Sequence, residues 1–311
     1  MVLVAGSANL DFVVRAPHLP APGETVLGGD FQTFAGGKGA NQAVACARAG
    51  GATTHMLLAL GDDPYAAPIE ASLRSAGVAM HIVRPSDAAT GTAFICVADG
   101  GENAITVAPG ANTCLSAADL PPLLGFSHLL MQLEIPLTAV MAYATAARAA
   151  GVRVVLNAAP ACTLPPELLA LVDLLVVNEG ELHSLVGRAA SVKECLERLP
   201  CPGAVVTLGA RGCVARLGQD FFVQPGYPID PVDSTGAGDT FCGTLVAALA
   251  QQMPLPKALR QASAAAALAC TQMGAQSSIP SASAVADFLQ HAPKAEGALS
   301  EAALRQYAGL T

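Results

Sequence analysis

From residue 127 onward, short apolar runs alternate with helical patterns, and this alternation strongly limits how the chain can fold. The predicted strands in this region are His128–Gln132, Arg153–Asn157, Leu174–Val177 and Ala204–Leu208. The predicted helices between them are Leu137–Ala150, Pro166–Val172 and Glu179–Val186. Strands joined through helices form parallel sheets with helices on both faces. Together with a buried strand at Val2–Ala5, the pattern predicts a three-layer α/β/α fold.

Polar side chains recur where these predicted strands end. Asn9 and Asp11 follow the first strand, and further polar residues follow the later ones: Glu134, Asn157, Asn178 and Glu181. A single residue of this kind is usually a helix cap. Because ligands of open α/β sheets bind outside the carboxyl ends of the strands, the recurrence indicates a site at that edge.

A small second sheet is predicted beside the main one. The runs Thr92–Ala98 and Asn103–Ala108 alternate around Asp99-Gly100-Gly101-Glu102, which is a hairpin signal. Glu24–Leu27 is a short alternating run in a segment rich in proline and glycine, and we expect loop and exposed strand there. The segment Glu24–Phe34 would join the hairpin in this second sheet. We therefore expect lid segments at about 12–35 and 92–108 within a single domain over 1–311.

The segment from Pro231 to Phe241 predicts an anion site. Gly236, Ala237 and Gly238 directly precede an apolar helical run, so several backbone N–H groups can point outward together at the helix start. Asp239 lies just inside this glycine cradle, where a carboxylate would repel an anion unless it acts as a base. On its own, the pattern fits a plain turn with a helix-capping acid equally well.

The remaining C-terminal segments are predicted to be helical. They are Gly238–Gln252, Pro256–Met273 ending in Gly274, Ser283–His291 and an amphipathic tail at Ser300–Tyr307.

A second glycine-rich segment, Gly36-Gly37-Lys38-Gly39-Ala40-Asn41-Gln42, leads into a predicted helix at Ala43–Ala49. It is not a P-loop, because that motif requires Ser or Thr after the lysine. Three glycines around Lys38 allow close approach of the backbone to a ligand, and Asn41 supplies a donor and an acceptor. The alternative is that this segment is a glycine-rich turn with no role in ligand binding.

Charge and cysteine usage exclude several kinds of partner. The 16 Lys and Arg residues against 24 Asp and Glu residues give a net charge of −8, which argues against nucleic acid and anionic membranes. No apolar stretch is long enough to span a bilayer, and no signal peptide is apparent. The nine cysteines form no C-x-x-C pair, so we expect free thiols in a cytoplasmic protein. The six histidines show no metal-ligand spacing.

The two glycine-rich signatures, with Asn178-Glu179-Gly180-Glu181 between them, resemble those of the ribokinase-like (PfkB-type) carbohydrate kinases. The resemblance runs from Gly6 to about Pro280. Within that family, Gly6–Asp11, Pro22–Thr25, Gly101–Asn103 and Pro109–Asn112 are similar to the branch that phosphorylates D-ribose with ATP.

The resemblance implies roles for individual residues. Asp239 would be the general base for the primary hydroxyl of the sugar, and the amides of Gly236, Ala237 and Gly238 would stabilise the transferring phosphoryl group. The positions that match sugar-binding residues are Asn9, Asp11, Gly37, Lys38, Asn41 and Glu134. Those that match nucleotide-binding residues are Asn178, Thr207, Gly209, Gly212 and Gly238.

The resemblance also implies two cations and a dimer. Glu181 would hold Mg²⁺ through water at the ATP phosphates. A monovalent cation such as K⁺ would bind beside the cradle, at Asp233, Thr235, Ala269, Gln272, Gly274 and Ser278. The lid sheet would pair with a second copy, because an open sheet edge invites pairing.

Three other functions compete with a ribose kinase. A kinase for another sugar or for a nucleoside, such as fructose or adenosine, would differ in the pocket around Asn9, Asp11, Asn41 and Glu134. An NAD-binding oxidoreductase fits the Rossmann-like sheet but would need G-x-G-x-x-G after the first strand, which Gly6-Ser7-Ala8-Asn9 does not provide. A sugar-binding regulator without activity is argued against by the intact Asp239 and glycine cradle.

Overall fold

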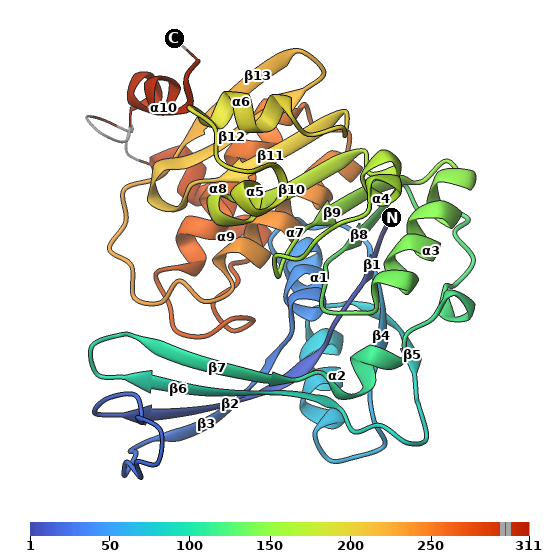
Figure 1. Ribbon diagram of the computed structural model, residues 1–311, viewed down its shortest axis with the longest axis vertical. Coiled ribbons are helices and arrows are strands. Elements are labelled where there is room, and N and C mark those ends of the chain that lie inside the picture. The colour runs from blue at the N-terminus through green and yellow to red at the C-terminus, as the bar shows by residue number, and fades with distance from the viewer. Residues whose placement is uncertain (293–295, 297–299, 311) are drawn as a thin grey trace.

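The protein is a three-layer α/β structure with a separate small sheet that projects from one end, as a computed structural model shows (Figure 1). The structure describes residues 1–292, 296 and 300–310. The main sheet has nine strands in the order β13-β12-β11-β10-β9-β8-β1-β4-β5. All neighbouring strands from β11 to β5 are parallel, whereas β12 pairs antiparallel with both β11 and β13. The predicted fold class is confirmed.

Five main-sheet strands lie close to the positions predicted for them, which were Val2–Ala5, His128–Gln132, Arg153–Asn157, Leu174–Val177 and Ala204–Leu208. The bounds of the main-sheet strands are β1 Val2–Ala5, β4 Thr54–Ala59, β5 Ala79–Val83, β8 His128–Met131, β9 Arg153–Asn157, β10 Leu174–Asn178, β11 Gly203–Thr207, β12 Gly212–Leu217 and β13 Asp220–Pro225. The parallel strands inside the sheet, unlike β5 at its edge, are almost wholly buried and consist mainly of apolar residues, as a sheet covered on both faces requires. Strand β5 was not predicted from the sequence, because half-buried residues at the sheet edge give a weak apolar signal.

The helices cover both faces of this sheet. Their bounds are α1 Lys38–Arg48, α2 Ala66–Ser75, α3 Leu137–Ala149, α4 Pro166–Leu171, α5 Glu179–Val186, α6 Val192–Glu197, α7 Ala237–Ala250, α8 Leu255–Ala269, α9 Ala282–His291 and α10 Glu301–Ala308. Helices α1, α2, α7, α8 and α9 enclose one core with the sheet, and α3, α4, α5, α6 and α10 enclose the other. Among these described helices, none is long and apolar enough to cross a membrane.

Two helix predictions were wrong in detail. Helix α1 begins at Lys38 and not at Ala43, because the residues Lys38–Gln42, Gly39 among them, are already helical. Helix α8 ends at Ala269, so Gly274 lies in the following loop and does not terminate the helix. The short helix α6 was missed in the segment before β11.

The small sheet contains four strands in the order β3-β2-β6-β7. They are β2 Asn9–Ala16, β3 Phe31–Gly36, β6 Gly91–Ala98 and β7 Asn103–Ala108. The predicted β6–β7 hairpin is confirmed. The expected contribution of Glu24–Phe34 to this sheet is confirmed only in part: Glu24–Leu27 has no regular structure, and β3 begins at Phe31. Strand β2 pairs with both β3 and β6.

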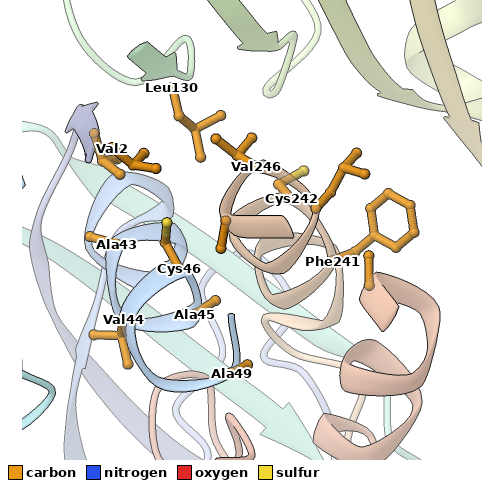
Figure 2. Close-up of a cluster of buried hydrophobic side chains, with 14 of the residues drawn as sticks. Val2, Ala43, Val44, Ala45, Cys46, Ala49, Leu130, Phe241, Cys242 and Val246 are labelled. Carbon is orange, nitrogen blue, oxygen red and sulfur yellow. The ribbon is translucent and has the colours of Figure 1, made fainter. Parts of the chain in front are cut away.

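Helices α1 and α7 pack against each other in the core and thereby join the two glycine-rich signatures. Figure 2 shows side chains of α1, including Ala45 and Cys46, next to Cys242 and Val246 of α7. The backbones approach so closely that a Cβ at Gly243 would lie 2.3 Å from the carbonyl oxygen of Gln42. The tight crossing fixes the start of α7 relative to the start of α1.

Candidate active site

The carboxyl ends of the parallel strands and the start of α7 enclose a pocket of about 140 Å³, called here the anion pocket. Its lining combines one lysine with three acidic or amide groups from strand ends and with the glycine cradle. The residues are Lys38, Asn157, Ala159, Val176, Val177, Asn178, Glu181, Thr207, Gly236, Gly238, Asp239 and Cys242. The structure therefore brings together the strand-end residues and the cradle that the sequence placed far apart.

Asp239 is buried at the wall of this pocket and is held by two amides. Its Oδ2 accepts a hydrogen bond from Asn41 Nδ2 at 3.0 Å, and its Oδ1 accepts one from Gln42 Nε2 at 2.9 Å. Burial raises the pKa of Asp239 above its ordinary value, against the lowering effect of the Lys38 ammonium and the two amide donors. A carboxylate with a raised pKa and fixed orientation is suited to accept a proton.

Gln42 is the centre of a buried amide network that sequence reasoning missed. Its Nε2 donates to Asn157 Oδ1 at 2.9 Å as well as to Asp239, and its Oε1 accepts from Gln132 Nε2 at 2.6 Å. Gln42 is fully buried. Since a buried amide with all its groups paired has little freedom to turn, Gln42 fixes the direction of the Asp239 carboxylate.

Asn41 is fixed in a similar way. Gln276 Nε2 donates to Asn41 Oδ1 at 3.1 Å, and Ser72 Oγ donates to Gln276 Oε1 at 2.6 Å. The loop after α8 and helix α2 therefore both contribute to the orientation of Asp239.

The start of α7 has the geometry of an anion site. Gly236 caps the helix in the left-handed region, with φ of 72°. Ala237 N donates to Ser234 O at 3.2 Å, whereas within the described residues the amides of Gly236, Gly238 and Asp239 have no acceptor. Two of the three predicted cradle amides, those of Gly236 and Gly238, are thus unpaired. The amide of Asp239 is a further candidate donor to an anion, and it was not predicted from the sequence.

The predicted sugar-binding residues gather where β2, the start of α1 and the segment after β8 meet. Glu134 Oε2 accepts from Ser7 Oγ at 2.5 Å and from the backbone N of Lys38 at 3.1 Å, so this carboxylate also caps α1. Asn9 Oδ1 accepts from Asn112 Nδ2 at 2.8 Å. Gly39 allows the close contact, since a Cβ there would lie 2.6 Å from Ser7 N. Gly37 is the N-cap residue of the same helix.

Three carboxylates surround Lys38. Burial lowers the pKa of the Lys38 ammonium, but Asp239, Glu134 and Glu181 outweigh it, so the pKa is raised and the side chain stays charged. Asp11 lies close to two of these acids. Burial, then Glu134 and Asp239, raise the pKa of Asp11 to about 7. At neutral pH Asp11 therefore exists in both protonation states.

The predicted nucleotide side is formed by the ends of β10 and β11. Asn178 and Glu181 form a capping box at the start of α5: Asn178 Oδ1 accepts from Glu181 N at 2.8 Å, and Glu181 Oε2 accepts from Asn178 N at 2.7 Å. Burial raises the pKa of Glu181, in spite of that hydrogen bond and of Lys38. Thr207 is paired with Asn178 in the sheet. Gly209 lies in the turn after β11 and Gly212 is the first residue of β12, and neither lines the anion pocket.

Asp233 connects the two loops of the predicted monovalent cation site. Its Oδ1 accepts from Thr235 N and its Oδ2 from Gly274 N, both at 2.9 Å. Burial alone would raise the pKa of Asp233, but these bonds outweigh it and hold the pKa below its usual value. Of the other predicted ligands, Ala269 is the last residue of α8, Gln272 is exposed, and Ser278 Oγ donates to Ala275 O at 3.1 Å.

A groove of about 360 Å³ lies between the small sheet and these loops. Asp11, Val13, Phe34 and Ile95 line it from the sheet, and Asp233, Thr235 and Gly274 line it from the other side. Asp11 therefore lies on the side of this groove that the small sheet forms.

Comparison with known proteins gives one consistent result. The pfkB family of carbohydrate kinases matches residues 1–282. A ribokinase of Haemophilus influenzae is 40% identical over 305 residues, covering 93% of this chain and 98% of the relative. The structure of Arabidopsis thaliana ribokinase complexed with ribose and ATP has a TM-score of 0.83 at 32% identity, covering 93% of this chain and 98% of that one.

The ribokinase of Cryptococcus neoformans in complex with ADP has a TM-score of 0.82 at 34% identity, covering 92% of this chain and 98% of that one. The chain therefore belongs to the pfkB family of carbohydrate kinases.

Proposed function

We propose that this protein is an ATP-dependent kinase that transfers a phosphoryl group to the primary 5-hydroxyl of D-ribose. The observation that carries the proposal is the position of Asp239. Four polar side chains, those of Asn9, Asp11, Lys38 and Glu134, lie on one side of this carboxylate. The unpaired amides at the start of α7 lie on its other side. Relatives named ribokinase, one of them solved with ribose and ATP, support the same substrates.

In the proposed reaction, Asp239 accepts the proton of the sugar hydroxyl while the hydroxyl oxygen attacks the terminal phosphorus of ATP. The bond between that phosphorus and the bridging oxygen breaks, and ADP leaves. The unpaired amides of Gly236 and Gly238 and the positive end of α7 stabilise the charge on the transferring group, and Lys38 adds a fixed positive charge. Asn41 and Gln42 hold the base in one orientation. Asn9, Asp11, Lys38, Asn41 and Glu134 bind the sugar hydroxyls.

Mg²⁺ at the ATP phosphates is part of the proposal. Glu181 and Asn178 supply oxygen ligands at the edge of the anion pocket, which is the donor type that Mg²⁺ takes, directly or through water. Bound Mg²⁺ neutralises phosphate charge. Activity should disappear when the metal is chelated with EDTA and return when Mg²⁺ is added in excess.

The substrate is tested with a panel of pentoses, hexoses and nucleosides in the presence of ATP and Mg²⁺. We expect the highest kcat/KM with D-ribose, because a closed site rich in carboxylates and amides needs a small polyol to pair them, and each unpaired polar group costs about 1–3 kcal/mol. ADP formation is the readout. A higher kcat/KM for adenosine or fructose would overturn the ribose assignment but not the family.

We also infer that the small sheet, including the predicted segments 12–35 and 92–108, is a lid. It covers the groove that Asp11 lines, and phosphoryl transfer to a sugar requires exclusion of water. Ribose is expected to slow hydrogen exchange in β2, β3, β6 and β7. Equal exchange in these strands with and without ribose would contradict lid closure.

We further infer that the lid sheet pairs with a second copy of the chain. The face of the small sheet that points away from the groove exposes apolar side chains: Phe31 is 62% and Phe94 55% exposed. Exposed apolar patches on open sheets mark association surfaces. Sedimentation at twice the chain mass is expected, and a single-chain mass at micromolar concentration would contradict the dimer.

Activation by K⁺ is a further part of the proposal. Asp233 is ionised and lies one turn before the cradle, and its bonds to Thr235 and Gly274 bring together two of the loops that would hold the ion. Ala269, Gln272 and Ser278 would complete the ligands, largely through carbonyl oxygens. A cation there would fix the orientation of the cradle amides.

We expect kcat to be higher in K⁺ than in Na⁺ or a bulky organic cation at matched ionic strength, with little change in the KM of ribose. The Asp233→Ala variant should lose this difference. Equal rates in the three salts would remove the monovalent cation from the proposal.

We place the enzyme in the cytoplasm, because all nine of its cysteines are free thiols and a reducing compartment keeps them so. Recovery of the protein in an extracellular fraction would contradict this placement.

A further inference from the structure

Helix α10 lies beyond the part of the chain that matches the family. The family match ends at residue 282, and α10 spans Glu301–Ala308. The Haemophilus influenzae relative is covered over 98% of its length while covering 93% of this chain. Helix α10 therefore lies outside the residues that the family model matches, and Figure 1 shows it beside β13 and α6.

This helix is firmly docked. Leu304 and Ala308 are buried in the same core as α5 and α6. Behind the helix, a Cβ at Gly309 would lie 2.6 Å from the Cβ of Ser191, the N-cap residue of α6. The packing places α10 in a fixed position against the protein.

One exposed side of α10 contacts the predicted nucleotide side through Tyr307. Arg211 Nη2 donates to Tyr307 Oη and to Glu179 Oε2, both at 3.1 Å, and Tyr307 Oη donates to Glu179 Oε1. The guanidinium carbon of Arg211 also lies 4.2 Å from the centre of the Tyr307 ring. A lone surface ion pair contributes little to stability. Here a cation–π contact and three hydrogen bonds act together to hold the three side chains in place.

The two residues that Tyr307 holds belong to the segments that border the anion pocket. Glu179 directly follows Asn178 at the start of α5, and Asn178 lines the pocket. Arg211 belongs to the turn Gly209–Arg211 that follows β11, just after the pocket residue Thr207. Tyr307 thus connects the ends of two neighbouring strands from outside the pocket.

We propose that α10 sets the affinity for the nucleotide, with Tyr307 as a positioning residue that fixes the Gly209–Arg211 turn relative to the start of α5. The inference rests on the proposed use of ATP. Tyr307 contacts no substrate in this account and acts only through Arg211 and Glu179.

The test compares three variants of the full chain: Tyr307→Ala, Tyr307→Phe and Gln306→Ala. Tyr307→Ala removes the ring and the hydroxyl, and Tyr307→Phe removes the hydroxyl alone. Gln306 is an exposed residue on the same helix and forms no side-chain hydrogen bond with the described residues, so Gln306→Ala is the matched control. Calorimetric titration with ATP gives the Kd without any need for sugar turnover, and the KM of ribose is measured separately.

We expect Tyr307→Ala to raise the Kd of ATP by about three- to tenfold, Tyr307→Phe to raise it less, and Gln306→Ala to leave it unchanged, with the KM of ribose unaffected. If Tyr307→Ala does not fold, Tyr307→Phe decides the outcome. An unchanged or tighter Kd in the folded variants would overturn the inference. A wild-type protein that binds ATP but does not phosphorylate ribose would contradict the proposed substrate and leave this inference standing.

Discussion

The Asp239→Asn variant is expected to lose about 10²–10⁴-fold in kcat, which is the usual contribution of a general base. An amide has nearly the same shape as the carboxylate but cannot accept the proton of the sugar hydroxyl. The variant should remain folded, because α7 is held in the core by its apolar face and by the close approach to α1.

Circular dichroism and ATP titration establish that the variant is folded and binds nucleotide, and single-turnover kinetics measure the chemical step. The Kd of ATP should change little, since Asp239 is assigned to the sugar hydroxyl. A variant that retains more than about a tenth of wild-type turnover would remove Asp239 from the role of base.

Replacement of Gln42 by alanine is expected to lower kcat by about 10²-fold, the size of effect that a small misplacement of a catalytic group produces. Gln42 Nε2 donates to Asp239 Oδ1 at 2.9 Å, and this bond lowers the pKa of the carboxylate against the effect of burial. Without it, the pKa of Asp239 rises further. Because the base must be ionised, the acidic limb of the kcat profile should move to higher pH.

The control for this experiment is Gln251→Ala. Gln251 lies at the C-terminal end of α7, and its Nε2 donates to Gly50 O at 2.8 Å, so it joins the α1 and α7 segments without touching the base. The control should keep the wild-type pH profile. An unchanged acidic limb in Gln42→Ala would mean that Gln42 only supports the fold.

The main sheet could be predicted because each parallel strand is a short apolar run bounded by turn residues. His128–Met131 and Arg153–Asn157 are of this kind and require no knowledge of their neighbours. The strand at Asn9–Ala16 could not be predicted in this way from its own residues. It contains Asp11 and Arg15 and precedes three prolines, and it becomes a strand by pairing with Phe31–Gly36 and with Gly91–Ala98, the second of which is far along the chain.

The same distinction applies to the site. The anion cradle at Gly236 could be predicted because a glycine cap and a helix start are local features. Gln42 could not, since its partner Asp239 is 197 residues away and only the α1–α7 crossing brings them together. The Tyr307 contact with Arg211 and Glu179 likewise depends on where α10 docks, which its amphipathic pattern does not specify.

The identity of the phosphorylated product tests the central claim most directly. The wild-type protein is incubated with ATP, Mg²⁺ and D-ribose, and the products are examined by phosphorus and carbon NMR. The account predicts ribose 5-phosphate and ADP in equal amounts, with phosphorus coupled to the carbon that bears the primary hydroxyl. ADP without a phosphorylated sugar, or phosphate on another hydroxyl, would contradict it.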